Sequence, residues 1–208
     1  MPNGAATRIR RNHAKILAAA EGVFLQHGFL GTNMDVVAER AGVSKQTVYA
    51  HFKSKEALFI EVVEAMTGGA ADEIGEDLVD VYDDRKAADF LLQIAIDQLI
   101  GVMTPRLMQL RRMVIGEVER FPELGKSLYQ NGPKRSIDRV ARACAHYTSI
   151  GELNAPDAQK AATQFNWLVM GAPINAAMLL GNDGIPSDKD QRDHAREAVR
   201  IFMCAYGS

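Results

Sequence analysis

Apolar residues recur at three- and four-residue steps along almost the whole of this 208-residue chain. Ile16, Ala20 and Val23 show this spacing near the N-terminus, and Val199 and Phe202 show it near the C-terminus. Because a helix has 3.6 residues per turn, such spacing places the apolar side chains on one helical face. No segment alternates apolar and polar residues convincingly, as a half-buried strand would. The pattern therefore predicts an all-α fold.

Glycine, proline and capping residues divide this pattern into about nine helices. The first is expected over residues 8–27, with Gly28 ending it. Two very short helices follow, over residues 34–41 and 45–51, with Thr32 or Asn33 and then Ser44 as caps. The later boundaries are expected at Ser54, Pro105, Pro122, Gly132, Pro156, Gly181 and Ser187.

The net charge of −2 hides an uneven distribution along the chain. Residues 1–55 contain eight Lys and Arg against three Asp and Glu, a net charge of +5, whereas residues 56–208 carry −7. A basic segment joined to an acidic one suggests that the basic part contacts nucleic acid. We therefore expect two domains, a DNA-binding head over 1–55 and a helical body over 56–208.

Several other classes of protein do not fit the sequence. Cys144 and Cys204 are too few for a disulfide framework, and no apolar run is long enough to span a membrane. The basic N-terminus lacks the apolar core of a signal peptide. The five histidines fall on different predicted helices, without the spacing of a zinc or hydrolase motif. A cytoplasmic protein with no catalytic residues, metal, cofactor or membrane partner is expected.

The stretch from Gly28 to Phe59 carries the most information. Its two short helices meet at Ala41-Gly42-Val43, where the glycine permits a tight turn, and Ala38 is small enough for the helices to cross closely. This arrangement predicts a helix-turn-helix, which places its second helix in the major groove of DNA.

The same stretch closely resembles the TetR family of transcriptional regulators. The matching positions are Gly28, Phe29, Thr32, Ala38, Ala41, Gly42, Val43, Ser44, Tyr49, Phe52, Lys55, Glu56 and Leu58. Further along, IGEVERFPELGKSLYQNGPKR resembles the C-terminal domain of the AefR-like branch of that family. The resemblance implies a homodimeric repressor that leaves its double-stranded DNA operator when a small apolar effector binds. The alternative is a dimeric small-molecule-binding or scaffold protein with a vestigial helix-turn-helix.

Docking of the second short helix in the groove assigns contacts to particular residues. Lys45 and Gln46 are expected at base edges, while Thr47, Tyr49 and His51 reach phosphates or nearby bases. Phosphate contacts are also expected at Thr32, Asn33 and Ser44, at helix N-termini, and at Lys55. Capping alone would explain the first three, and Tyr49 could instead pack on Phe52. Arg8, Arg10 and Arg11 could form a mobile arm over DNA or only a solvated tail.

The resemblance also implies an effector pocket and a dimer interface in the body. Polarizable and aromatic candidates for the pocket lining are Phe90, Met103, Met108, Met113, Phe121, Tyr129, Trp167 and Met170. The last two helices are expected to dimerise through Phe165, Leu168, Ala172, Ala176, Leu179, Val199, Phe202 and Tyr206. In both sets, plain core packing within one chain is the competing interpretation.

Overall fold

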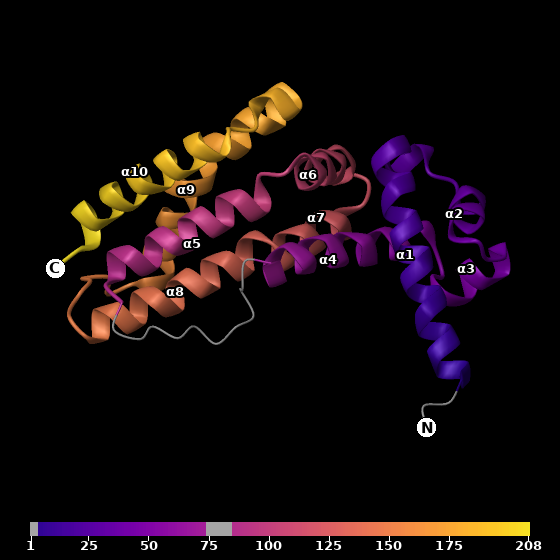
Figure 1. The fold of residues 1–208 in the computed structure, drawn as a ribbon, viewed down its shortest axis with the longest axis horizontal. Coiled ribbons are helices and arrows are strands. Elements are labelled where there is room, and N and C mark those ends of the chain that lie inside the picture. The colour runs from indigo at the N-terminus through magenta and orange to yellow at the C-terminus, as the bar shows by residue number, and fades with distance from the viewer. Residues whose placement is uncertain (1–3, 74–84) are drawn as a thin grey trace. The chain divides into compact units, whose positions relative to one another are not determined.

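The computed structural model describes residues 4–73 and 85–208, with side chains described for 6–68 and 85–208. Helices account for most of the described residues, and the only extended pairing among them is an isolated bridge between Leu153 and Gly207 (Figure 1). The all-α prediction is confirmed.

The described part of the chain contains ten α-helices. The first four are α1 (Gly4–Gly31), α2 (Met34–Ala41), α3 (Lys45–His51) and α4 (Lys55–Glu73). The remainder are α5 (Ala87–Val102), α6 (Pro105–Glu117), α7 (Pro122–Asn131), α8 (Pro133–Ser149), α9 (Ala158–Leu180) and α10 (Asp188–Tyr206). A 3₁₀ turn, η1 (Gly181–Gly184), separates α9 from α10.

The chain divides into two compact units, and the division differs from the predicted boundary at residue 55. The N-terminal unit comprises Met1–Met66 together with Gln109–Leu128, and the C-terminal unit comprises Thr67–Met108 together with Tyr129–Ser208. The predicted head is extended because Leu58, Val62 and Val63 of α4 are buried. Charge composition gave no indication that a segment 50 residues further along the chain would return to this unit.

Aromatic side chains form the centre of the N-terminal unit. Phe59 of α4 lies 4.6 Å from Phe24 and 5.2 Å from Phe29, between ring centroids. Phe121 packs on Phe29 at 4.7 Å, and Gln109 Nε2 donates a hydrogen bond to Leu25 O. These contacts bind the 109–128 segment to α1 and explain why it belongs to this unit.

Two glycines with positive φ shape the N-terminal unit. Gly28 (φ 72°) has a non-helical backbone and breaks the first helix where its end is predicted, so α1 consists of two helical pieces joined across a kink, the second ending at Gly31. Gly42 (φ 66°) ends α2 in the left-handed conformation that favours glycine, and its N–H bonds to the last carbonyls of α2. At the other end, α1 begins at Gly4, before the predicted start at residue 8.

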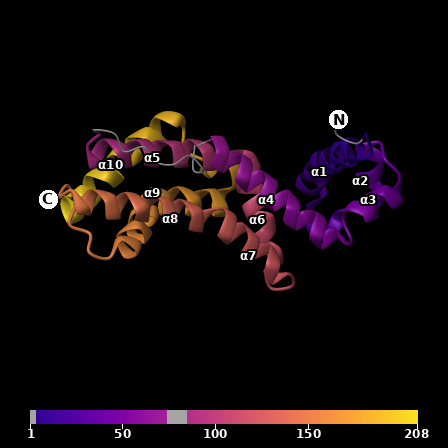
Figure 2. The same cartoon turned by 90° about the horizontal axis from the view of Figure 1, so that it is seen from below.

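The C-terminal unit is built from α5, α8, α9 and α10. α10 packs against α5 and α9, and α8 packs against α9, as Figure 1 and the turned view in Figure 2 both show. α9 begins at Ala158 because the Asp157 carboxylate accepts a hydrogen bond from Lys160 N, so Pro156 precedes the cap rather than opening the helix. Ser187 caps α10, as predicted.

Candidate nucleic-acid interface

α3 is held by its cap and by a single buried side. Ser44 Oγ accepts a hydrogen bond from Thr47 N, and Val48 and the following Phe52 are buried. The opposite side leaves Lys45, Gln46 and Tyr49 exposed, with 43% of the Tyr49 surface accessible. This face has the donors, acceptors and aromatic ring that base edges and phosphates require.

Lys45 forms an ion pair across the turn between α2 and α3. Its Nζ lies 2.8 Å from an oxygen of Asp35, and both side chains are more than half exposed. The hydrogen bond that Lys45 donates to the Asp35 carboxylate, together with the charge of that carboxylate, raises the pKa of the Lys45 ammonium. Sequence reasoning did not identify Asp35 as the partner of Lys45. The available signal was an acidic residue in the first turn of α2.

The predicted phosphate contacts at helix N-termini have a clear structural role as caps. Asn33 Oδ1 accepts from Asp35 N at 2.9 Å, and Ser44 Oγ lies 2.8 Å from Thr47 Oγ1. These three side chains remain at or near the surface. Thr32 does not: it is buried, and its hydroxyl donates to Gly28 O at 2.7 Å, where it secures the bend in α1. The prediction of a phosphate contact through the Thr32 side chain is therefore corrected.

Lys55 reaches back to the end of α1. Its Nζ lies 3.4 Å from Leu30 O and 3.3 Å from Thr32 O, and 4.8 Å from the centroid of the Phe29 ring. Carbonyls at a helix end attract a cation, so Lys55 fastens α4 to α1. An ammonium has three donors, and these contacts use two of them.

His51 belongs to a small, partly exposed cluster of the head. Its ring lies 5.8 Å from that of His13, which contacts the Phe52 ring in a tilted arrangement at 4.8 Å between centroids. His13 Nε2 in turn lies 2.8 Å from a Glu61 carboxylate oxygen. The cluster joins α1, the end of α3 and α4.

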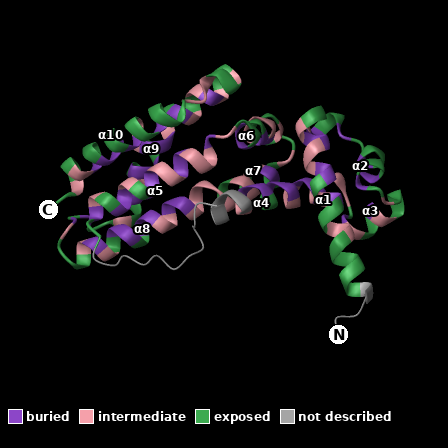
Figure 3. Ribbon diagram, viewed as in Figure 1, coloured by how far each residue is buried: buried purple, intermediate pink, exposed green. Residues whose placement is uncertain are grey.

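The basic residues near the N-terminus do not form an extended arm. Arg8, Arg10 and Arg11 lie on α1, and all three are exposed. Figure 3 shows the N-terminal part of α1 coloured mainly as exposed. The helix fixes their backbone, so the prediction of a mobile arm is wrong for these residues.

The predicted effector residues do not form one group. Phe90, Met103, Met108 and Met170 are buried in the C-terminal unit. Tyr129 and Trp167 are 53% and 67% exposed, so neither lines the interior of a single chain. Met113 and Phe121 belong to the N-terminal unit. An apolar or aromatic residue type does not specify which side of its helix is buried, and this explains the error.

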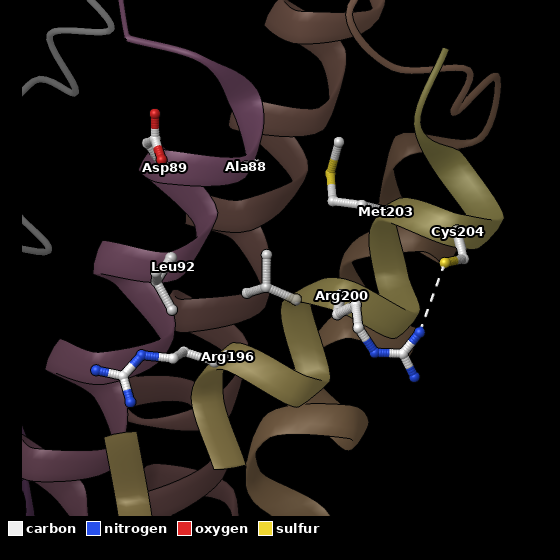
Figure 4. Close-up of a pocket in the computed structure, with 8 residues that line it drawn as sticks. Ala88, Asp89, Leu92, Arg196, Arg200, Met203 and Cys204 are labelled. Atoms are coloured by element: carbon white, nitrogen blue, oxygen red, sulfur yellow. Dashed lines mark hydrogen bonds between the residues drawn. The ribbon is translucent and has the colours of Figure 1, made fainter. Parts of the chain in front are cut away.

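Two surface pockets are described in the C-terminal unit, and both lie between α5 and α10. The larger, of about 440 Å³, is lined by Ala88, Asp89, Leu92, Arg196, Val199, Arg200, Met203 and Cys204 (Figure 4). The smaller, of about 260 Å³, is lined by Gln93, Ile96, Asp97, Ile100, Gly101, Thr104 and Arg192. No predicted effector residue lines either of them.

The predicted dimer residues separate into core and surface. Phe165, Val199 and Phe202 are buried, and the rings of Phe165 and Phe202 meet edge to face at 5.2 Å. They are core residues of one chain, which corrects their assignment to the interface. Leu179 is 76% exposed, Ala172 is exposed, and Leu168, Ala176 and Tyr206 are partly exposed. Trp167, Ala172 and Leu179 are all exposed on α9. The sequence analysis had instead assigned Trp167 to the effector pocket.

Known proteins share both parts of this architecture. Residues 89–208 match the family described as "AefR-like transcriptional repressor, C-terminal domain", and residues 16–62 match "Bacterial regulatory proteins, tetR family". A solved TetR-family regulator from Mesorhizobium loti is 32% identical, with a TM-score of 0.88 over 97% of this chain and 99% of that one. The chain belongs to the TetR family of transcriptional regulators. The resemblance seen in the sequence is confirmed.

Other relatives of this TetR-family protein differ in how much they share with it. The flavonoid-responsive regulator FrrA is 28% identical, with a TM-score of 0.79 over 95% of this chain and 97% of FrrA. The activator FasR of Mycolicibacterium smegmatis is 35% identical over 72 residues, and RutR of Escherichia coli is 52% identical over 48. These two matches span only 33% and 23% of the relatives' lengths.

The TetR-family chain shows no group of three or more metal-ligating side chains in the parts that the structure describes. Within the same described ranges, no single helix meets the length and hydropathy expected of a membrane span; α5 and α6 meet them only as a pair bent by 74°.

Proposed function

We propose that this TetR-family protein is a homodimeric repressor that binds an operator through α3 and releases it when a small aromatic effector binds the C-terminal unit. The observation that carries the DNA-binding part is the exposed face of Lys45, Gln46 and Tyr49 on a capped α3, within a head of net charge +5. A vestigial head would be expected to lose these polar side chains.

The docking model gives each exposed residue a role. Lys45 suits guanine O6 and N7, and Gln46 suits adenine N6 and N7. Tyr49 contacts phosphate or a nearby base, while Asn33, Ser44 and Thr47 support phosphate binding at the starts of α2 and α3. His51 and Lys55 lie at the edge of this surface, where Lys55 has one donor left for a phosphate.

Dimerisation supplies the second half-site. One short helix reads too few bases for useful specificity, so the two copies of α3 must lie about 34 to 36 Å apart, or a multiple of that. The exposed face of α9, with Trp167, Ala172 and Leu179, supports a dimer surface because large apolar side chains on a surface favour association.

Two similarities support the effector and its effect. The C-terminal match is to a repressor domain, and the similar regulator FrrA responds to flavonoids. An effector releases DNA only if it binds the operator-incompetent state of the dimer more tightly than the competent one. We therefore expect an aromatic effector with unequal affinity for these two states.

The test is selection of binding sites from random DNA, followed by titration of the selected site. We expect an inverted repeat, and Gln46→Ala should change the preferred bases within each half-site. Recovery of no enriched sequence, or an unchanged preference in Gln46→Ala, would contradict the docking model.

A further inference from the structure

Two primary amides meet inside the C-terminal unit. Gln98 of α5 is 4% exposed and Asn166 of α9 is 8% exposed. Gln98 Nε2 donates a hydrogen bond to Asn166 Oδ1 at 2.8 Å. The other buried residues of these two helices are apolar, among them Leu91, Ile94, Ala95, Leu99, Ala162, Phe165, Val169 and Met170.

The Gln98 amide is only half satisfied. Its Oε1 is buried and has no hydrogen-bond partner in the part of the chain that the structure describes. Leaving a buried acceptor unpaired destabilises the folded chain. A methionine would occupy a similar volume but would leave Asn166 Oδ1 without its donor, so the amide pair explains the nitrogen of Gln98 and not its unpaired oxygen.

Gln191 provides a comparison within the same unit. It is also 4% exposed, and its Oε1 is likewise unpartnered among the described residues. Its amide nitrogen, however, donates to Pro186 O at 2.9 Å, at the start of α10. The Gln191 side chain therefore satisfies a backbone carbonyl just before α10. Gln98 lies in the last part of α5, but its amide nitrogen donates to the Asn166 side chain of α9 rather than to a backbone carbonyl.

We propose that Gln98 Oε1 accepts a hydrogen bond from a hydroxyl group of the effector, which is therefore a neutral phenol rather than a plain hydrocarbon. This rests on the proposed function, which places an aromatic effector in this unit. An amide oxygen carries no charge, so it pairs with a neutral donor without leaving a buried ion uncompensated.

The same contact connects the effector to α9. Gln98 can accept from the effector while its Nε2 still donates to Asn166, because the two bonds use different atoms of one amide. Asn166 is followed directly by Trp167, which lies on the exposed side of α9. A shift of the Gln98 side chain would therefore act on the helix that carries the proposed dimer surface.

The test uses pairs of probes in which one has a hydroxyl group that can donate a hydrogen bond and the other has a methoxy group in its place. The probes are 6-, 7- and 4′-hydroxyflavone and the three corresponding methyl ethers, with affinities measured by isothermal titration calorimetry. We expect at least one hydroxyflavone to bind the wild-type dimer about tenfold or more tightly than its ether. Gln98→Met should reduce this ratio to near one, and Gln191→Met, the matched control, should leave it unchanged.

A second variant covers the case in which the first one does not fold. If Gln98→Met fails to fold, the double variant Gln98→Leu/Asn166→Leu removes both partners at once and should be nearly neutral for folding. Equal affinity for ether and phenol in the wild type overturns the proposal. So does an unchanged ratio in Gln98→Met, which is the result expected if Oε1 binds only an ordered water.

Failure of this proposal is distinguishable from failure of the proposed function. Operator release by hydroxyflavones and by their ethers alike would support the proposed repressor function and would contradict only the contact with Gln98. Binding of none of the probes would overturn both the phenol contact and the aromatic effector class, while operator affinity in the same preparation reports on the head.

Discussion

Lys45 and Lys55 both belong to the proposed DNA surface, but their ammonium groups have different partners in the free protein. Lys45 pairs with an exposed carboxylate, Asp35, whereas Lys55 lies against the carbonyls at the end of α1. An exposed ion pair contributes about 0 to 1 kcal/mol, so DNA can replace Asp35 as the partner of Lys45 at low cost. At the scale of single residues, these partners determine how much of each charge is available to phosphate.

Asp35→Asn is expected to increase affinity for non-specific DNA several-fold. Freed Lys45 can then contact phosphate, and the plot of log affinity against log salt should become steeper by up to about 0.9. Fluorescence anisotropy with a random-sequence duplex measures both quantities. Glu39→Gln removes the same charge from an exposed position of α2 that has no ion pair with Lys45. If the two variants behave alike, the effect is one of net charge and not of the pair.

Lys55→Met is expected to have two effects. It keeps an unbranched side chain over Phe29 but loses the bonds to Leu30 O and Thr32 O, so the free energy of unfolding should fall by about 1 kcal/mol. It also removes the third N–H donor of the ammonium, which the docking model assigns to a phosphate. The plot of log affinity against log salt should therefore become shallower by about 0.9. Thermal unfolding and a salt titration of operator affinity check these separately. An unchanged salt slope would restrict Lys55 to joining α1 and α4.

At the scale of helices, α9 and α10 each present apolar residues on more than one side. Phe165 and Phe202 face each other within the chain, whereas Trp167 and Leu179 face outward. A charge on the two kinds of position should therefore have different consequences.

Leu179→Glu is expected to weaken the dimer while leaving the fold intact. Phe202→Glu should instead lower the melting temperature strongly, because it buries a charge beside Phe165. Sedimentation velocity and thermal unfolding distinguish the two results. A Leu179→Glu protein that sediments as the wild type does would place the dimer surface away from this end of α9.

At the scale of the whole molecule, the fold determines the reactivity of the two thiols. Cys204 is exposed, whereas Cys144 on α8 is fully buried, and burial raises its pKa to about 11. Since the thiolate is the reactive form, both access and ionisation protect Cys144 in the folded chain.

One thiol per chain is expected to react with a maleimide at pH 8, and two after denaturation. In Cys204→Ala, labelling should then report global unfolding alone.

The raised pKa also means that Cys144 stabilises the fold below the ordinary thiol pKa, and that this contribution is lost as the pH rises from about 9 towards 11. Unfolding free energies over this range should fall more steeply than in Cys144→Ala. Labelling of Cys144 in the folded Cys204→Ala protein would contradict the assigned burial.

The sequence by itself determined the helical fold, the helix-turn-helix and the family, because these depend on interactions between residues close in the chain. Helical spacing, the Asn33 and Ser44 caps and the Gly42 turn all act within a few residues. Only the tertiary structure decided which apolar faces became core and which side chains met across helices. Gln98 and Asn166 lie 68 residues apart, and residues 109–128 return to the head. Spacing along one helix identifies its apolar sides but not the helix that will cover each of them, because that depends on how the helices cross.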